Sequence, residues 1–404
     1  MPQDNFSCTI DLHFDPWGYA DDAELEVLLP LPSSDGYQHV LAVTAPDGLD
    51  IVDASGHRRL VRLEQGQTAT VTVRVATQRL RHGQYLQLPP PGPADLAAAP
   101  MIVADEALRD LALRCITGID NPRDRIAALA KATADALRYQ YPRDGRGAAR
   151  SLARGWGDCG EYAFVFTALC RLADIPARPV FGLLAAPWMT SPHAWAEAWD
   201  GTGWLPVDPN FVREGVYLGP LFDTGAQPQD HIGALDMYRL VLSRHTGIPW
   251  PGAVPDIQPA QAAGFMLDLD GIGTVAFWHA APAWQARPVV PFLQMPWTVI
   301  AKPRPASLRS TWRRLRPWRV KLRAPSRRWP RSPWVVADIV AMHPAKGIAF
   351  VIAAVALMAW VPPLSAALQG AVWLWVAVFG LGMLRYARLM RLRSKRRAGR
   401  AAST

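Results

Sequence analysis

Alternating apolar and polar residues dominate the first 95 residues, and no helical period competes with them there. Residues 23–31 alternate, as do residues 68–75, where Val71, Val73 and Val75 share one face. Asp-Gly pairs at 35–36 and 47–48 and a glycine at 66 separate the runs at the spacing of short antiparallel strands. The pattern predicts an all-β, sandwich-like domain over 1–95, which ends in a stiff proline-rich linker at 89–93.

A helical period replaces the alternation after the linker. Residues 105–116 place Leu108, Leu111 and Cys115 on one face, and Asn121-Pro122 opens a second helix with an apolar stripe. The next stretch, 142–157, is polar and glycine-rich and is a candidate wall of a substrate groove. Residues 178–184 are typical of a strand, and a loop is expected at 185–191. Helices followed by antiparallel strands predict an α+β core over 100–250.

Five residues at 157–161, Gly-Asp-Cys-Gly-Glu, place a thiol in the first turn of the next helix. Asp158 has the position of an N-cap and Glu161 that of its capping-box partner, so the helix is expected to begin at Cys159 and to end before Pro176. Free N–H groups and the positive end of the helix dipole favour a thiolate, which predicts a lowered pKa for Cys159. The alternative is a buried structural cysteine.

Two further side chains stand where a cysteine nucleophile needs them. Residues 191–199 alternate strictly, with His193 on one face, and a second short strand at 204–208 ends at Asp208. The Asp-Gly-Thr-Gly sequence at 200–203 joins the two as a hairpin. A two-residue loop places His193 directly opposite Asp208, whereas a four-residue loop makes Asp208 its diagonal neighbour on the same face. Either register lets the carboxylate orient the imidazole and the imidazole deprotonate the thiol.

The stretches GDCGEYAFVFTALCRLADIPAR, HAWAEAW and GWLPVDPN, in this order, closely resemble the core of transglutaminase-like (papain-like) cysteine enzymes. The resemblance covers about residues 101–210. It implies that the nucleophile, base and orienting acid of the family fall on Cys159, His193 and Asp208. It also implies a bacterial, membrane-anchored type, in which a preceding β domain supports the core or presents the substrate.

Acyl-transfer chemistry also needs two hydrogen-bond donors for the oxyanion. The backbone N–H of Cys159 is one, and three aromatic residues are candidates for the second: Trp156, Tyr139 and Tyr141. Glu197 shares the strand face of the candidate base and is either a supporting residue or a charge at the strand edge. The tryptophans of the hairpin are expected to pack around it: Trp195, Trp199 and Trp204.

Charge divides the chain into an acidic body and a basic tail. Residues 301–404 hold 21 Lys and Arg and one acid, Asp338; since the whole chain carries +9, residues 1–300 carry −11. The pI near 9.7 therefore does not indicate nucleic-acid binding by the body. The four cysteines lack paired spacing, so no disulfide framework is expected. His231 and His245 lack the spacing of metal ligands, and neither a metal nor another cofactor is expected. An acidic start without a basic and apolar leader predicts no signal peptide.

The tail carries a long uncharged stretch, 347–384, which Pro362-Pro363 divides into two apolar arms. It predicts a transmembrane helical hairpin at 346–384, between a basic Pro/Trp-rich juxtamembrane segment at 301–345 and a basic tail at 385–404. The alternatives are buried helices or a re-entrant hairpin. Basic flanks stay in the cytoplasm, which predicts attachment to the inner membrane with the catalytic core on the cytoplasmic side and contact with lipid headgroups.

These features predict a membrane-tethered cysteine enzyme that acts on peptide or carboxamide bonds through a thioester. Its substrate is expected to be a peptide or protein, and water is the default acyl acceptor. The alternatives are a protein-glutamine transglutaminase, in which an amine accepts the acyl group, and a non-catalytic membrane scaffold that retained the fold. Residues 251–300 are assigned as an extension of the core. Between residues 213 and 301, the apolar runs at 237–242 and 273–277 are candidate strands that close the sheet of the core.

Overall fold

The computed structural model describes residues 5–14, 25–46, 52–54, 58–63, 69–99, 101–140, 146–186, 189–212, 231–244, 248–249, 289–290, 298–300, 318–323 and a few helical residues between 369 and 384. The chain separates into two compact units, Met1–Arg213 with Gln227–Arg327, and Glu214–Ala226 with Arg328–Thr404. The N-terminal strands and the core both belong to the first unit, which is described below.

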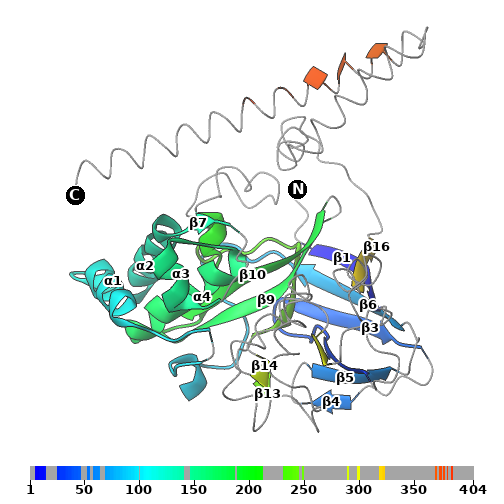
Figure 1. The fold of residues 1–404 in the computed structure, drawn as a ribbon, viewed down its shortest axis with the longest axis horizontal. Helices are drawn as coiled ribbons and strands as arrows, with labels where there is room; N and C mark the ends of the chain where they lie inside the picture. The colour runs from blue at the N-terminus through cyan, green and yellow to red at the C-terminus, as the bar shows by residue number, and fades with distance from the viewer. Residues whose placement is uncertain are drawn as a thin grey trace, which may run out of the picture. The chain divides into compact units, whose positions relative to one another are not determined.

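Four helices form one layer of the core: α1 Glu106–Ile116, α2 Pro122–Ala136, α3 Ala148–Arg154 and α4 Cys159–Leu172. Asp105 caps α1 by accepting from the N–H of Leu108, and Asn121 caps α2 just ahead of Pro122. The two helices predicted ahead of the catalytic segment are therefore confirmed. Figure 1 shows α1 to α4 gathered beside the long strands β9 (Ala177–Ala186) and β10 (Met189–Trp199).

Helix α4 is the centre of the core. Every residue from Cys159 to Cys170 is buried, because the sequence is apolar on all sides of the helix. It packs against the other three helices on one side and against β9 and β10 on the other. The start of α4 is therefore held from several directions, as a site for chemistry requires.

The core sheet is antiparallel, with the strand order β11-β10-β9-β12, where β11 is Trp204–Val207 and β12 is Arg239–Ser243. The run at 237–242 thus closes the sheet as expected, whereas 273–277 lies outside the described residues. Gly182 of β9 pairs with His193 on one side and Val241 on the other. A Cβ at Gly182 would collide with the carbonyl oxygen of Leu240, so the close approach of β12 requires glycine there.

The hairpin between β10 and β11 has the four-residue loop. Trp199 pairs with Trp204, which leaves 200–203 as the loop, so the two-residue register is wrong and the diagonal one is confirmed. The carboxylate of Asp200 accepts from the N–H groups of Thr202 and Gly203 and fixes the longer turn. Gly201 takes a positive φ of 95°, which glycine adopts without strain.

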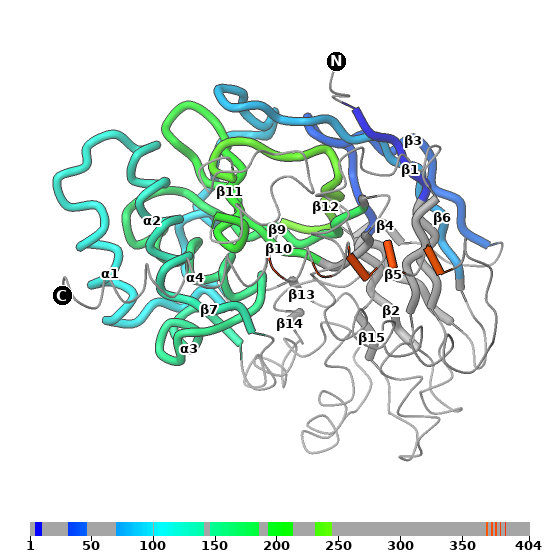
Figure 2. Tube along the Cα trace, turned by 90° about the horizontal axis from the view of Figure 1, so that it is seen from above, coloured from blue at the N-terminus to red at the C-terminus, as the bar shows by residue number. Residues whose placement is uncertain are grey.

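The N-terminal region contains two antiparallel four-stranded sheets, β16-β1-β6-β3 and β15-β2-β5-β4. Its strands are β1 Asn5–Phe14, β2 Leu25–Pro30, β3 Gln38–Thr44, β4 Val52–Ala54, β5 Arg58–Leu63 and β6 Ala69–Gln78. The N-terminal region is β-stranded as predicted, and the face that carries Val71, Val73 and Val75 is buried. Figure 2 draws β1, β3 and β6 side by side.

Two strands of these sheets come from the distant C-terminal part of the first unit. β15 (Thr298–Ile300) pairs with β2, and β16 (Trp318–Arg323) pairs with β1. The sequence pattern instead predicts an extension of the core over 251–300 and a juxtamembrane segment over 301–345. Trp318, Val320 and Leu322 alternate with other residues in the basic run, which is a strand pattern that is hard to recognise among so many charged residues.

Two short pairings, each between two-residue strands, complete the described strands: β7 Arg138–Tyr139 with β8 Trp156–Gly157, and β13 Ile248–Pro249 with β14 Val289–Val290.

The proline-rich linker lies along the core. Leu80 and Leu86 form isolated β-bridges with Leu235 and Trp204, and the indole N–H of Trp204 donates to the carbonyl of Pro89 at 2.8 Å. A short 3-10 turn follows at Pro93–Asp95. The linker therefore binds the hairpin that carries His193.

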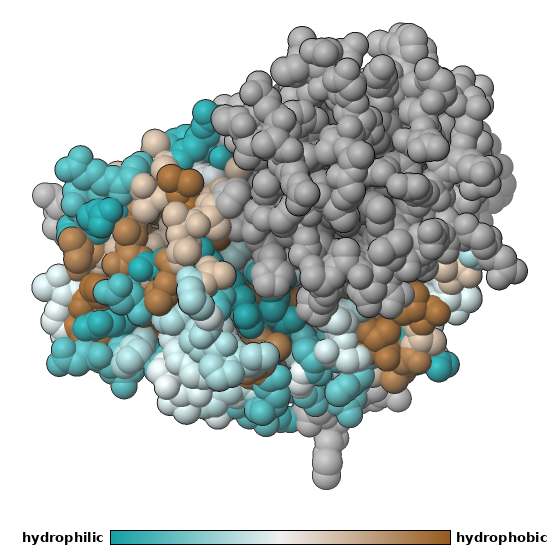
Figure 3. Space-filling model, turned by 90° about the horizontal axis from the view of Figure 1, so that it is seen from below, coloured by the Kyte–Doolittle hydropathy of each residue, from teal (hydrophilic) through white to brown (hydrophobic). Residues whose placement is uncertain are grey.

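On the face drawn in Figure 3, the hydrophobic residues of the described part form small groups with hydrophilic residues between them. Within the described residues, no helix has both the length and the apolarity needed to cross a membrane. The hairpin predicted at 346–384 lies almost wholly outside the described residues, as do the segments at 324–345 and 385–404.

Candidate active site

The candidate nucleophile is the first residue of α4, as the capping motif predicts. The Asp158 carboxylate accepts from the N–H of Gly160 at 2.8 Å, and the Glu161 carboxyl accepts from the N–H of Asp158 at 3.2 Å, which completes the capping box. Cys159 is 5% exposed. Its own backbone N–H lies in the first turn, where helix N–H groups have no partner within the helix.

A buried arginine joins the two carboxyl groups of this cap. Arg146 lies 3.1 Å from Asp158 and 3.0 Å from Glu161, and all three side chains are buried. Burial and the charge of Asp158 raise the pKa of Glu161 to about 8. Burial also acts to raise the pKa of Asp158, but Arg146 and the hydrogen bonds around it outweigh burial and lower it. Near neutral pH the cluster therefore holds one guanidinium, one carboxylate and one protonated acid.

We expect this cluster to make stability depend on pH. An unfolded glutamate titrates near about 4.3, so the raised pKa of Glu161 favours folding most below that pH, and the contribution is lost as the pH rises through about 8. The urea midpoint should fall between pH 6 and pH 9 in the unmodified protein. Glu161→Gln keeps a neutral donor and acceptor and should remove most of this fall, whereas Glu106→Gln, at an exposed position, should not. An equal fall in the Glu161→Gln protein would contradict the assignment.

The candidate base and acid meet across the hairpin. His193 on β10 and Asp208, just after β11, join through Nε2 and Oδ2 at 2.7 Å, and their exposures are 4% and 3%. The imidazole lies between two aromatic rings, with centroids 5.0 Å from Phe211 and 6.1 Å from Trp195. Because Nε2 is engaged by the carboxylate, Nδ1 is the nitrogen available to take a proton.

The pKa of the Cys159 thiol is the reverse of the prediction. The backbone of Ala194, the residue after His193, hydrogen-bonds to the Cys159 thiol. Burial, and then the negative charge of Asp158, raise the pKa of Cys159 well above its ordinary value, and the Ala194 contact offsets this only in part. The helix dipole is a local effect that the sequence reveals, whereas the loss of water around the sulfur depends on tertiary packing. The resting site therefore favours the thiol over the thiolate.

One of the three candidates for the second oxyanion donor pairs with the segment that leads to the nucleophile. β7 and β8 pair Tyr139 with Gly157, two residues before the nucleophile. The Tyr139 residue is 52% exposed, but burial around its hydroxyl raises the pKa of that hydroxyl, so it stays a donor. The Trp156 ring instead lies 4.1 Å from the Arg154 guanidinium, and Tyr141 lies outside the described residues. Tyr139 is the best candidate.

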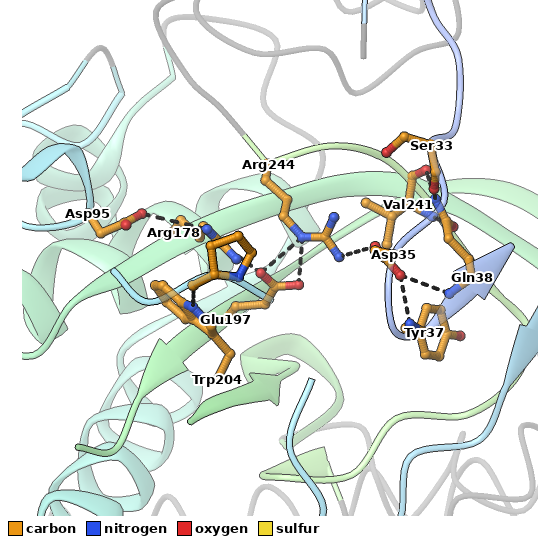
Figure 4. Close-up of polar contacts among 11 residues, drawn as sticks. Ser33, Asp35, Tyr37, Gln38, Asp95, Arg178, Glu197, Trp204, Val241 and Arg244 are labelled. Atoms are coloured by element: carbon orange, nitrogen blue, oxygen red, sulfur yellow. Dashed lines mark hydrogen bonds and ion pairs between the residues drawn. The ribbon is translucent and has the colours of Figure 1, made fainter. Parts of the chain in front are cut away.

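Glu197 is not a charge at a strand edge. It is buried within a chain of ion pairs, in which its carboxylate accepts from Arg178 at 2.8 Å and from Arg244 at 2.9 Å. Arg244 also forms an ion pair with Asp35 at 2.7 Å, and Arg178 lies 4.0 Å from Asp95 (Figure 4). The tryptophans of the hairpin pack as expected: Trp195 and Trp204 are fully buried and Trp199 meets Trp204 edge to face.

Sequence reasoning missed two further residues of the site. Arg239 on β12 donates to Asp208 Oδ2 at 2.5 Å, and Asp236 accepts from the same guanidinium at 2.7 Å. Neither residue belongs to a recognisable motif, and only the strand pattern at 237–242 marked their neighbourhood. Among the described residues, no group of three His, Cys, Asp or Glu side chains is arranged to hold a metal ion.

Residues 109–209 match the transglutaminase-like superfamily. The matched segment begins within α1 and ends one residue after Asp208, so it contains Cys159, His193 and Asp208. The core of this chain is therefore a transglutaminase-like domain, and the resemblance of its sequence motifs is confirmed. No curated protein matches the chain.

Three solved structures are similar to the chain at low identity. A candidate cysteine protease from Cytophaga hutchinsonii is 14% identical, with a TM-score of 0.48, over 81% of this chain and 93% of that one. A candidate protease from Parabacteroides distasonis is 9% identical, with a TM-score of 0.25, over 61% and 48%. A structure described as a TGase is 14% identical, with a TM-score of 0.20, over 43% and 44%. All three TM-scores lie below 0.5.

Proposed function

We propose that the protein is a cysteine enzyme that attacks a peptide or carboxamide carbonyl with Cys159, and that His193 and Asp208 act as base and orienting acid. The observation that carries this proposal is the buried His193–Asp208 contact at 2.7 Å beside a thiol at the start of α4. The family match over 109–209 agrees with it. The three residues stand in the order nucleophile, base and acid, as in a Cys-His-Asp triad.

The geometry supports a two-stage reaction. His193 Nδ1 takes the thiol proton while Sγ forms a bond to the carbonyl carbon, and the oxyanion accepts from the Cys159 N–H and the Tyr139 hydroxyl. The intermediate collapses as the C–N bond breaks, His193 returns the proton to the leaving amine, and a thioester remains. A second nucleophile, activated by His193 in the same way, then releases the acyl group and restores the thiol.

Water is the proposed second nucleophile, which makes the enzyme a peptidase or amidase. A groove that admits a peptide also admits water. Transglutaminase activity is the same reaction with an amine as the acceptor. The test is mass spectrometry of a peptide library incubated with the protein in H₂¹⁸O, with and without added amine. Incorporation of ¹⁸O supports hydrolysis, amine adducts convert the assignment to acyl transfer, and an unchanged library in both cases supports a non-catalytic scaffold.

We further propose that residues 346–384 tether the enzyme to the inner membrane, with the catalytic core in the cytoplasm. The support is the charge pattern of the sequence: an uncharged stretch with basic residues on both sides. Anionic headgroups would attract these flanks. A cytoplasm-active reporter should work when fused at either end of the chain, and export-dependent activity at one end alone would replace the hairpin with a single crossing.

A further inference from the structure

Arg239 and His193 share one carboxylate oxygen and one pair of aromatic rings. The Arg239 guanidinium is 1% exposed, donates to Asp208 Oδ2 at 2.5 Å, and lies 4.9 Å from the Phe211 centroid and 5.4 Å from that of Trp195. The same rings flank the imidazole. The other oxygen of Asp208 accepts from the Phe211 N–H at 3.0 Å. Both carboxylate oxygens are thus engaged, which holds Asp208 in one orientation toward the base.

The charge of Arg239 also matters for proton transfer. A carboxylate beside an imidazole favours its charged form, and a guanidinium on the same carboxylate opposes this. Burial acts to raise the pKa of Asp208, but His193 and then Arg239 outweigh it and lower it, so the acid stays ionised. Arg239 therefore helps to keep Asp208 a charged acceptor for the imidazole of His193.

The strand that carries Arg239, with the residues on either side of it, is held in turn by the N-terminal β region. The side-chain amide of Gln38 donates to the Val241 carbonyl at 2.9 Å and accepts from the Val241 N–H at 2.8 Å, as a neighbouring strand would. The Tyr37 hydroxyl donates to the Asp236 carbonyl at 2.6 Å, and Asp35 pairs with Arg244. Figure 4 shows Asp35 and Gln38 reaching from the N-terminal segment to Arg244 and Val241.

We propose that Arg239 is a positioning residue for the catalytic acid and that residues 35–38 of the N-terminal β region hold it in place. The inference rests on the proposed function, because it assigns a partner to Asp208 in that reaction. It also gives the N-terminal region a definite role in catalysis, since this region completes the active site through β12 instead of acting as a detached support.

The test is steady-state kinetics of the full-length protein and its Arg239→Lys and Gln38→Ala variants. Lysine cannot bridge both carboxylates, so Arg239→Lys should lower kcat by about 10- to 100-fold with little change in KM.

Gln38→Ala removes the clamp without leaving a buried charge, so it should fold and should show a smaller loss of kcat, again with little change in KM. His39→Ala, exposed on the same strand, is the matched control and should behave as the unmodified protein. An unchanged kcat in Gln38→Ala would overturn the inference, even if Arg239→Lys does not fold. Full turnover in Cys159→Ala would instead overturn the proposed function, so the two failures are distinct.

Discussion

Replacing Cys159 by alanine is expected to lower turnover by at least about 10⁴-fold, and His193→Ala should have nearly the same effect. Alanine removes the sulfur that forms the thioester in one case and the group that deprotonates it in the other. Because the burial of Cys159 raises its pKa, the enzyme cannot rely on a standing thiolate, and the base is indispensable. The double variant should be no less active than either single one, since the two residues act in one step.

The controls separate chemistry from structure. Cys170 lies on the same helix, is also buried and lies away from the cap, so the Cys170→Ala variant should retain activity. Asp208→Ala should leave more residual activity than either main variant, because its role is to orient the base. Losses that add in the double variant would show that Cys159 and His193 do not share a mechanism. The measurement is initial rates on a library-selected substrate, with circular dichroism to confirm folding.

The second large effect is expected at Arg146. Arg146→Ala leaves Asp158 buried beside Glu161 without a counter-charge, and breaking a buried ion pair in this way destabilises a protein by about 3–5 kcal/mol. The start of α4 should loosen first, because both carboxyl groups belong to its cap. Urea unfolding followed by circular dichroism measures the change in free energy.

Arg150→Ala is the matched control, since Arg150 lies on α3 close to Arg146 in sequence but is exposed. Its free energy of unfolding should stay within about 0.5 kcal/mol of the unmodified protein. A similar loss in both variants would mean that removal of a positive charge near α4, and not the buried cluster, is responsible.

The parts of the site that sequence reasoning found are those with a local signal. Residues 158–161 contain the complete capping motif of α4, and the alternation along 191–199 identifies the strand that carries His193. Local patterns left two registers open for the hairpin. The choice depended on Asp200, whose side chain accepts from two loop N–H groups and stabilises the longer turn.

The residues that sequence reasoning missed act through contacts between distant segments. Arg146 lies in a glycine-rich stretch without a period, and Arg239 follows Asp208 by 31 residues, so no spacing rule connects either to the candidate site. The pKa of Cys159 also depends on tertiary packing, because burial raises it and burial is not visible in a local motif.

The close approach of β12 to Gly182 limits which residues of this site can change independently in evolution. A side chain at that position would push β12 away from β9, and Arg239 would leave Asp208 with it. The glycine and the arginine are therefore expected to be inherited as a pair, although 57 positions separate them in the sequence. Among transglutaminase-like sequences, those with a larger residue at the position of Gly182 should also have lost the arginine, and their histidine should depend on the acid alone.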